Sequence, residues 1–554
     1  MSQTTVPGPP GEATERRRGA REPVPAVDLR PAPQPRFSMR AVAGLAALVV
    51  LALVFRVEGR GMSFWLDEGL SVGIASHPFT DIPGLLRQDG SPPLYYLVLH
   101  VWMLAFGSSE EAVRALSLLF GLATIPLAFW SAGSLFGRRA AWAAATLAAT
   151  SGSLAYYSRE ARMYTLVSLL ALLALTAFVH AFAFGRRRWL PVLVLSLVGL
   201  LYTHNWGLYL ALGLAAGTAV VMAAAGPERR RRVLVDGFLV AGATALAYAP
   251  WVPTLVAQAA TTGAPWSRPP DLGSLVGVIG WVVDHDGIVI AFALVGLPAV
   301  VVLARRWRAG GEALAAVALA AVLGVSMVSA WVASLVEPAW ASRYFTMFVP
   351  AVVLLMALGL AREGRRGLWA LGLVAFLGLQ PLASFPGIRE DGPTQKSNVR
   401  RSVLMVDHLA GSGDLVVSTQ IEHVPLLRYY LGPELRYADP LGEVDDPQVV
   451  DWRNATERLR QATPELGLSP LVEGLGAGRH VFLVCPRSQS RHDDDEDPLE
   501  WFALMERHCL TWRDALVGDA SLTRVLGPVS PNPRRTGGSS VFITVFEKQV
   551  EPAR

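Results

Sequence analysis

Apolar segments separated by short polar connections run along the chain from residue 41 to residue 385. A helix that crosses a bilayer needs about 20 mainly apolar residues, and segments near this length recur throughout this region. The pattern predicts eleven membrane-spanning helices, at residues 41–55, 112–135, 140–155, 163–184, 190–202, 207–225, 233–250, 287–304, 312–335, 344–361 and 367–385. We therefore expect a polytopic α-helical membrane protein.

One apolar segment, residues 92–106, decides the topology. It is short, begins with Pro92-Pro93 and contains His100. If it crossed the membrane, every later arginine cluster would lie outside, whereas all of them lie inside if it occupies the outer interface. These clusters are Arg138-Arg139, Arg186-Arg187-Arg188, Arg229 to Arg232, Arg305-Arg306 with Arg308, and Arg362 with Arg365-Arg366. Because cytoplasmic loops are enriched in Lys and Arg, we interpret residues 92–106 as an interfacial or re-entrant helix on the outer face.

The ends of the chain differ in composition from the apolar region. Residues 1–38 are polar and rich in proline and arginine, without the apolar core of a signal peptide, which indicates a disordered cytoplasmic tail. Residues 39–386 form the membrane domain, whose long outer loops, 57–111 and 251–286, are expected to carry the chemistry. With an odd number of spans, residues 387–554 then lie outside the cell.

This C-terminal region is soluble in character. Strand-like runs occur at residues 415–418, 481–484 and 541–546. Helix-like runs near residues 456–461 and 499–508 alternate with them, so the region is predicted to be an extracytoplasmic α/β domain. It contains the only two cysteines, Cys485 and Cys509, which could pair outside the cell or remain as two buried thiols. The acidic run Asp493–Asp497 is interpreted as a solvated loop.

The overall composition agrees with a membrane protein. The chain is 52% hydrophobic and only 17% charged, whereas soluble domains carry about 25% charged residues. Its net charge of +4 does not indicate a nucleic-acid partner, because the basic residues form short clusters between apolar segments instead of one basic face. The lipid bilayer is the partner that this pattern favours.

The first outer loop begins with a pair of carboxylates. Asp67 and Glu68 follow the first span and come directly after Phe64, Trp65 and Leu66, which are residue types that favour the membrane–water boundary. Ionisable groups near hydrocarbon are costly, so such a pair is a functional-site candidate. The ordinary alternative is that Asp67 caps a short surface helix and Glu68 lies in its first turn.

With this topology, further polar groups collect on the outer side. The second outer loop carries Arg159, Glu160 and Arg162, the third carries His204, and the fifth carries Arg343. Singly, these residues could form a local ion-pair cluster, a helix cap or a lipid-headgroup contact. Together they predict a cavity that contains carboxylates, an imidazole, arginines and aromatic rings at the outer membrane surface.

This combination suits sugar transfer from a lipid phosphate. A carboxylate can act as general base toward an acceptor hydroxyl that attacks an anomeric carbon. Guanidinium groups pair with phosphate and stabilise it as a leaving group. No nucleotide-binding motif is needed, because an activated donor outside the cell would be linked to lipid.

Four motifs in these loops resemble the bacterial glycosyltransferases of the GT-C superfamily. The nearest relatives are the protein O-mannosyltransferase branch and the lipid A aminoarabinose transferases. The motifs are Trp65-Leu66-Asp67-Glu68, Ser91-Pro92-Pro93-Leu94-Tyr95-Tyr96, Tyr157-Ser158-Arg159-Glu160-Ala161-Arg162-Met163-Tyr164 and Ser342-Arg343-Tyr344. The resemblance covers roughly residues 41–385.

The resemblance implies an inverting transfer, on the outer face of a bacterial plasma membrane, from a polyprenyl-phosphate sugar to a protein, lipid or glycan acceptor. It implies that Asp67 is the catalytic acid/base residue, that Glu68 supports it, and that Glu160 is the second acidic residue. The implied substrate-binding residues are Tyr95, Arg159, Arg162, Tyr164, His204, Arg343 and Tyr344. Some relatives bind a divalent metal and others need none, and Asp67, Glu160 and His204 are the residues that could hold one here.

Two other functions are compatible with a multi-pass chain. A transporter or flippase would use the same carboxylates as a relay, but transporters place ionisable residues near the middle of the membrane on broken helices. Here the polar groups lie at the ends of the predicted spans. A non-catalytic scaffold of an envelope complex would explain the C-terminal domain but not the acidic and arginine-rich loops.

Overall fold

The computed structural model describes residues 38–57, 61–283, 285–383, 396–487, 499–530 and 540–549. Within them, every predicted apolar segment is helical. The helices before residue 384 are α1 (Met39–Val57), α2 (Leu66–Ala75), α3 (Ile82–Asp89), α4 (Leu94–Phe106), α5 (Glu110–Phe136), α6 (Arg138–Thr150), α7 (Gly152–Tyr157), α8 (Tyr164–Phe178), α9 (Leu190–Leu201), α10 (Gly207–Ala224), α11 (Pro227–Tyr248), α12 (Val252–Thr261), α13 (Leu272–Val283), α14 (Asp286–Ala291), α15 (Leu297–Ala304), α16 (Gly311–Val336), α17 (Val349–Arg362) and α18 (Gly364–Ala383). The predicted tail, Asp284 and the acidic run Asp493–Asp497 lie outside the described residues.

Seven helical segments of the described chain are long and apolar enough to cross a membrane. They are Met39–Val57, Glu110–Phe136, Tyr164–Ala183, Gly207–Ala224, Pro227–Thr261, Asp286–Ala304 and Gly311–Val336. A membrane protein built of helices is thus confirmed, while the count of eleven spans stays a prediction. The predicted span at 140–155 is divided, because α6 ends at Thr150 and the Ser151 hydroxyl caps α7 by accepting a hydrogen bond from the Leu154 N–H at 3.3 Å.

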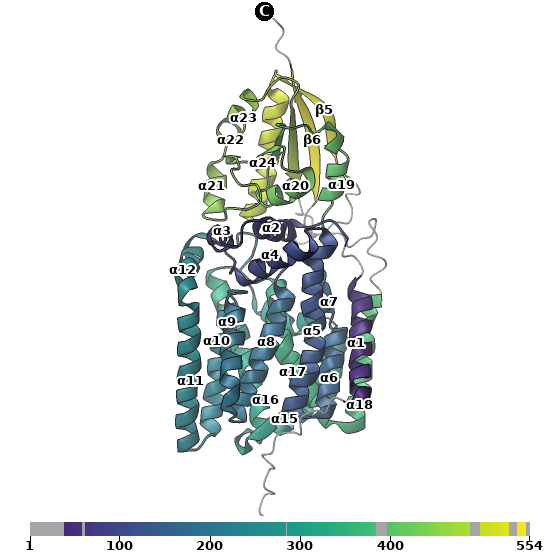
Figure 1. Ribbon diagram of the computed structural model, residues 1–554, viewed down its shortest axis with the longest axis vertical. Coiled ribbons are helices and arrows are strands. Elements are labelled where there is room, and N and C mark those ends of the chain that lie inside the picture. Colours follow the sequence, from purple (N-terminus) through teal and green to yellow (C-terminus); the bar gives the residue numbers. More distant parts are fainter. Residues whose placement is uncertain are drawn as a thin grey trace, which may run out of the picture. The chain divides into compact units, whose positions relative to one another are not determined.

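The segment predicted to be interfacial forms α4, which starts directly after Pro93. It packs against α2 and against the start of the bundle at α5. In Figure 1, α2, α3 and α4 lie together at one end of the long helices. This arrangement fits a helix that lies across the ends of the spans. The first outer loop is therefore gathered at one end of the bundle.

A buried arginine anchors the end of α1, just before this loop. Arg56 is fully buried and donates hydrogen bonds to the carbonyl oxygens of Gly121 at 2.9 Å and Ala148 at 2.7 Å. The last carbonyls of a helix have no partner within the helix, and Arg56 supplies one near the end of α6. The same side chain thus ties α1 to α5 and α6 next to the first two predicted outer loops.

The C-terminal region folds around a six-stranded mixed sheet with strand order β3-β2-β1-β4-β6-β5. The strands are β1 (Leu415–Ser418), β2 (Arg436–Asp439), β3 (Gly442–Glu443), β4 (His480–Pro486), β5 (Leu522–Val529) and β6 (Val541–Lys548). β1 pairs in parallel with β2 and β4, and the remaining pairs are antiparallel. The helices are α19 (Val399–Leu404), α20 (His423–Leu431), α21 (Ala455–Gln461), α22 (Pro464–Gly467), α23 (Ser469–Glu473) and α24 (Glu500–Gly518). The predicted α/β character is confirmed, and a disulfide between Cys485 and Cys509 joins β4 to α24.

The C-terminal domain packs closely on the first outer loop, with α20 against α2. Two glycines of α2 allow this approach. A Cβ atom on Gly73 would lie 2.1 Å from the carbonyl oxygen of Gln448, and one on Gly69 would lie 3.0 Å from the Cα of Leu426. Only glycine leaves room for backbone at such distances. The helix that carries Asp67 is therefore held between the membrane helices and the C-terminal domain.

Candidate active site

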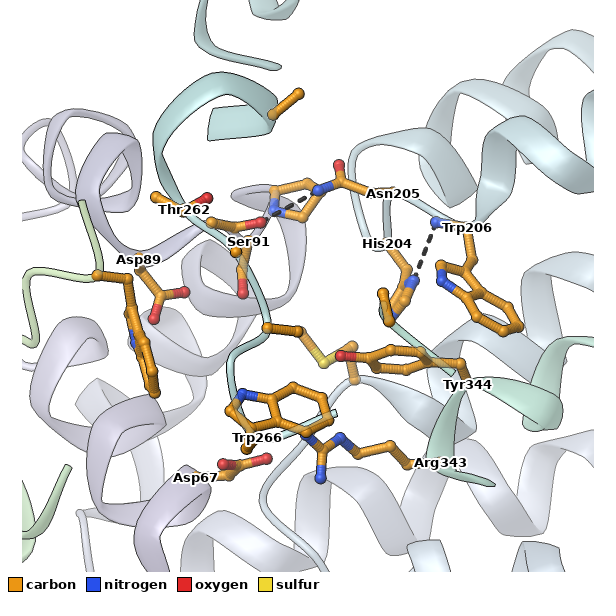
Figure 2. Close-up of a pocket in the computed structure, with 18 of the residues that line it drawn as sticks. Asp67, Asp89, Ser91, His204, Asn205, Trp206, Thr262, Trp266, Arg343 and Tyr344 are labelled. Atoms are coloured by element: carbon orange, nitrogen blue, oxygen red, sulfur yellow. Dashed lines mark hydrogen bonds between the residues drawn. The ribbon is translucent and has the colours of Figure 1, made fainter. Parts of the chain in front are cut away.

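A cavity of about 300 Å³ opens where the outer loops meet the C-terminal domain (Figure 2). Its walls come from α2, the end of α3, the loops before α4, α8 and α10, the segments after α12 and α16, and one residue of the C-terminal domain. Five of the predicted site residues line it, namely Asp67, Arg162, His204, Arg343 and Tyr344. These residues are up to 277 positions apart in the chain, and the structure brings them to one cavity.

Asp67 lies in the first turn of α2, where the helix dipole favours a carboxylate. Its Oδ2 is 3.7 Å from Nη2 of Arg162, and its side chain is 23% exposed. At this distance the two side chains form an ion pair but no hydrogen bond. The carboxylate oxygens can therefore still accept hydrogen bonds from a group in the cavity. Asp67 is thus placed to receive a proton from a bound group.

Arg343 faces the cavity from the segment that precedes α17. Its guanidinium lies 4.2 Å from the centre of the Trp266 ring and 5.5 Å from that of Tyr344. The Nε atom is buried, and the described residues give it no hydrogen-bond partner. Burial disfavours the charged form, but Asp67 together with Tyr164 and Tyr344 outweighs it, so the pKa of Arg343 is raised. The side chain is a permanent cation with a free donor for an anion.

Arg162 is the second cation of the cavity. Its Nη1 donates to the hydroxyl of Ser71 at 3.1 Å and to the backbone oxygen of Asp67 at 3.3 Å. Its Nε is also buried without a partner in the described part of the chain. Because Arg162 contacts α2 from the loop before α8, it fixes the position of Asp67 relative to the bundle and adds a second donor toward an anion.

His204 is held neutral. Burial, assisted by the charges of Arg162 and Arg343, lowers the pKa of His204 to about 3. Its Nδ1 accepts a hydrogen bond from the Trp206 N–H at 3.1 Å, so the ring carries its proton on Nε2. The ring packs against Tyr344 with centroids 4.7 Å apart. His204 therefore forms a polar wall with one N–H donor and is not a proton acceptor at neutral pH.

Glu68 does not line the cavity, although it follows Asp67 directly. Its carboxylate is 1% exposed and pairs with Arg114, whose Nε and Nη2 donate at 2.7 and 2.6 Å. It also accepts hydrogen bonds from the backbone N–H of Ala161 at 2.9 Å and of Trp65 at 3.3 Å. All of these contacts join α2, α5 and the loop before α8, which makes Glu68 a positioning residue in this structure.

Glu160 and Arg159 are likewise not among the cavity residues. Glu160 is buried and forms an ion pair with Lys396, whose ammonium lies 4.0 Å from the centre of the Tyr156 ring. Arg159 donates from Nη2 to the backbone oxygen of Phe55 at 2.7 Å. These contacts tie the second outer loop to the end of α1 and to the start of the C-terminal domain.

The two remaining predicted residues support the walls. Tyr95 is buried in α4, and its hydroxyl lies 3.3 Å from that of Ser117. Tyr164 is buried at the start of α8 and packs between the rings of Tyr157 and Tyr344 at centroid distances of 4.9 and 6.4 Å. Neither side chain is among the residues that line the cavity.

Most of the other lining residues had no predicted role, and three of them bear on the chemistry. Asp89 ends α3 in the first outer loop, Trp266 follows α12, and Trp452 belongs to the C-terminal domain. Burial raises the pKa of Asp89, because the cavity wall shields its carboxyl group from water. Asp89 could have been predicted as a site residue, because it lies in the predicted first outer loop. Trp452 had none, because only the docking of the C-terminal domain brings it to the membrane domain.

The residues suggested for a divalent metal do not form a ligand set. Asp67 and His204 line the cavity, but Glu160 pairs with Lys396 instead of facing them. In the described residues, no three His, Cys, Asp or Glu side chains are grouped as metal ligands. No catalytic step is therefore assigned to a metal here.

Two solved structures share this fold over nearly the whole chain. They are ArnT from Cupriavidus metallidurans in the apo state and bound to undecaprenyl phosphate, with TM-scores of 0.59 and 0.57. Each is 13% identical, and each match covers 92% of this chain and 98% of the ArnT chain. Residues 90–255 also match the family model described as dolichyl-phosphate-mannose-protein mannosyltransferase. The chain has the GT-C glycosyltransferase fold.

The GT-C resemblance predicted from the loop motifs is therefore confirmed. A comparison with curated proteins gives no match. The residues matched by the family model run from the end of α3 to α12 and include Arg162 and His204. The family match therefore includes two of the five predicted residues that line the cavity.

Proposed function

We propose that this GT-C protein transfers a sugar from a polyprenyl-phosphate donor to an acceptor hydroxyl on the outer face of a bacterial plasma membrane. The acceptor belongs to a protein, a lipid or a glycan. One observation carries the proposal. The Asp67 carboxylate shares a cavity with the guanidiniums of Arg162 and Arg343, and each guanidinium has a buried Nε–H without a described partner.

The two arginines suit the phosphate of the donor. A buried guanidinium donor without a partner favours the binding of an anion, because an unsatisfied charged donor is costly in a low-dielectric site. Two oxygens of a phosphate can accept hydrogen bonds together from the planar guanidinium fork. The ArnT fold supports the lipid part of this assignment, since ArnT binds undecaprenyl phosphate. Arg343 and Arg162 would hold the phosphate in the ground state and stabilise its charge as it leaves.

Asp67 suits the acceptor. Its carboxylate accepts the proton of the acceptor hydroxyl while the oxygen of that hydroxyl attacks C1 of the sugar. The bond between C1 and the phosphate oxygen breaks, and its electron pair leaves with the polyprenyl phosphate. This single displacement inverts the configuration at C1. Neutral His204 adds an N–H donor to the wall, and Glu68 and Glu160 hold the loops that carry Asp67 and Arg162.

The test is donor turnover by the purified, reconstituted protein. Labelled polyprenyl-phosphate mannose, arabinose, glucose and galactose are offered in turn to wild type, Asp67→Asn and Asp81→Asn. Loss of a general base lowers turnover by about 10²–10⁴-fold, so Asp67→Asn should be nearly inactive at wild-type stability. Asp81 is an exposed carboxylate in the same outer loop, and its variant should match wild type. An Asp67→Asn protein that turns over donor normally contradicts the mechanism.

A further inference from the structure

One residue of the cavity wall comes from outside the membrane domain. Trp452 follows β3 in the C-terminal domain and lines the same cavity as Asp67. Its backbone N–H donates to the carbonyl oxygen of Gln88 at 2.9 Å, and the N–H of Asn454 donates to that of Thr261 at 2.8 Å. Backbone bonds to the ends of both α3 and α12 hold this segment in register with the membrane domain.

The indole of Trp452 is also held from behind. It stacks on Trp501 with ring centroids 5.5 Å apart and planes inclined by 28°. Trp501 is 1% exposed and donates from Nε1 to Oε1 of Glu422 at 3.1 Å. A ring fixed by a second, buried ring loses little conformational freedom on binding, so it offers a rigid apolar surface to whatever enters the cavity.

The Trp452 N–H is bonded to Gln88, the residue directly before Asp89, and the lining of the cavity also includes the polar residues Ser91, Asn205 and Thr262. Figure 2 shows Asp89, Ser91 and Thr262 together at one end of the view, with Asp67 and Arg343 near Trp266 at the other. Asn205 donates to the Gly90 carbonyl at 3.1 Å, and its Oδ1 is buried without a described partner. A cavity whose lining combines an indole ring with carboxylate, amide and hydroxyl oxygens suits a ring that carries many hydroxyls.

The size of the cavity favours the sugar over a larger group. About 300 Å³ lies at the lower end of the range for small-molecule sites, which suits a monosaccharide better than a peptide or a glycan chain. A phosphate held by Arg162 and Arg343 is bonded directly to the sugar, so the sugar must occupy the same enclosed space. The remaining lining of the cavity, which includes Asp89 and Trp452, is then available to the sugar.

We infer that Trp452 determines donor specificity by stacking on the sugar ring of the lipid-linked donor, while Asp89 and Asn205 accept hydrogen bonds from its hydroxyls. The C-terminal domain thereby completes the donor site of the membrane domain. This inference rests on the proposed function, because it assigns the sugar half of a site whose phosphate half is Arg162 and Arg343.

The experiment compares two probes that differ only in the sugar. Affinities are measured for undecaprenyl phosphate and for the undecaprenyl-phosphate sugar that wild type turns over, using full-length protein in nanodiscs. Trp452→Ala should weaken the sugar-bearing probe about tenfold and leave undecaprenyl phosphate within twofold of wild type. Trp452→Phe should retain most of the affinity, because it keeps an aromatic face. Trp369→Ala, at an 81% exposed tryptophan of α18, is the matched control.

Two further variants separate the halves of the site. Asp89→Asn should weaken the sugar-bearing probe alone, and Arg343→Gln should weaken both probes. Equal loss of both probes in Trp452→Ala would show a structural role and overturn the inference. An unchanged affinity for both would place Trp452 away from the donor sugar and also overturn it. If wild type bound neither probe and turned over no donor, the proposed function itself would fail.

Discussion

The buried ion pair of Glu68 and Arg114 allows a test of whether Asp67 or Glu68 takes part in catalysis. Glu68→Gln keeps the size of the side chain but removes its charge. In the structure the carboxylate accepts four hydrogen bonds, from Nε and Nη2 of Arg114 and from the N–H groups of Ala161 and Trp65. A glutamine has one oxygen and places its NH₂ group against one of these donors, so at least one donor faces another donor.

The magnitude follows from burial. Side chains of the pair are 1% and 3% exposed, so the guanidinium left behind cannot be solvated. Removing one partner of a buried ion pair costs about 3–5 kcal/mol. Asp67→Asn should cost far less, because Asp67 is 23% exposed and lies 3.7 Å from Arg162. We therefore expect Glu68→Gln to lower both stability and activity, and Asp67→Asn to lower activity alone.

The assay is unfolding of each variant in the same detergent, monitored by tryptophan fluorescence, together with donor turnover. Glu68→Leu combined with Arg114→Leu removes both charges and should recover part of the lost stability. Recovery is incomplete because Arg114 also donates to the backbone oxygens of Met62 at 2.6 Å and Ser63 at 3.2 Å. A Glu68→Gln protein as stable as wild type would refute the positioning role, and if it were also inactive, Glu68 would act in the chemistry.

Two further predictions concern the docking of the C-terminal domain on α2. The His77–Asp446 hydrogen bond at 2.9 Å raises the pKa of His77 above its ordinary 6.5, so its stabilisation is present below pH 6.5 and is lost as the pH rises through the raised value. Because Asp446 is 37% exposed, this is worth under about 1 kcal/mol, and Asp446→Asn should reduce the pH dependence of the melting temperature above pH 6.5. Gly73→Ala places a Cβ atom 2.1 Å from the Gln448 oxygen and should destabilise the docked domain by about 1–3 kcal/mol. Gly84→Ala is the control, because the Cβ atom would lie in open space on α3 and should not change stability. Equal melting temperatures for the two variants would contradict the close contact between α2 and the C-terminal domain.

The helices and the general place of the site could be predicted because they depend on local composition. A run of apolar residues must satisfy its backbone groups internally in a bilayer, so it becomes helical whatever its neighbours are. Arg343 and His204 were placed in the site for a related reason, since polar groups at span ends gather on the side to which the topology sends them. Neither the helices nor the side of the membrane depends on distances between side chains.

The division of labour between adjacent residues needed the structure. Asp67 and Glu68 are consecutive on α2, and an α-helix turns about 100° per residue, so their side chains point in different directions. One reaches the cavity and the other reaches Arg114. The loop motifs placed both residues in the catalytic site, because side-chain direction depends on how the helix packs and not on the residue type.

By itself, the sequence determined a helical membrane protein with a GT-C type arrangement of loops and a separate C-terminal α/β domain. It did so through hydrophobic length, arginine distribution and short motifs, which are all local properties. Tertiary structure alone decided that Lys396 pairs with Glu160 and that Trp452 enters the cavity wall. Lys396 is 236 positions from Glu160 and Trp452 is 385 positions from Asp67, so no local pattern could have indicated either contact. Glycines of α2 leave room for the close approach of the C-terminal domain on which both contacts depend.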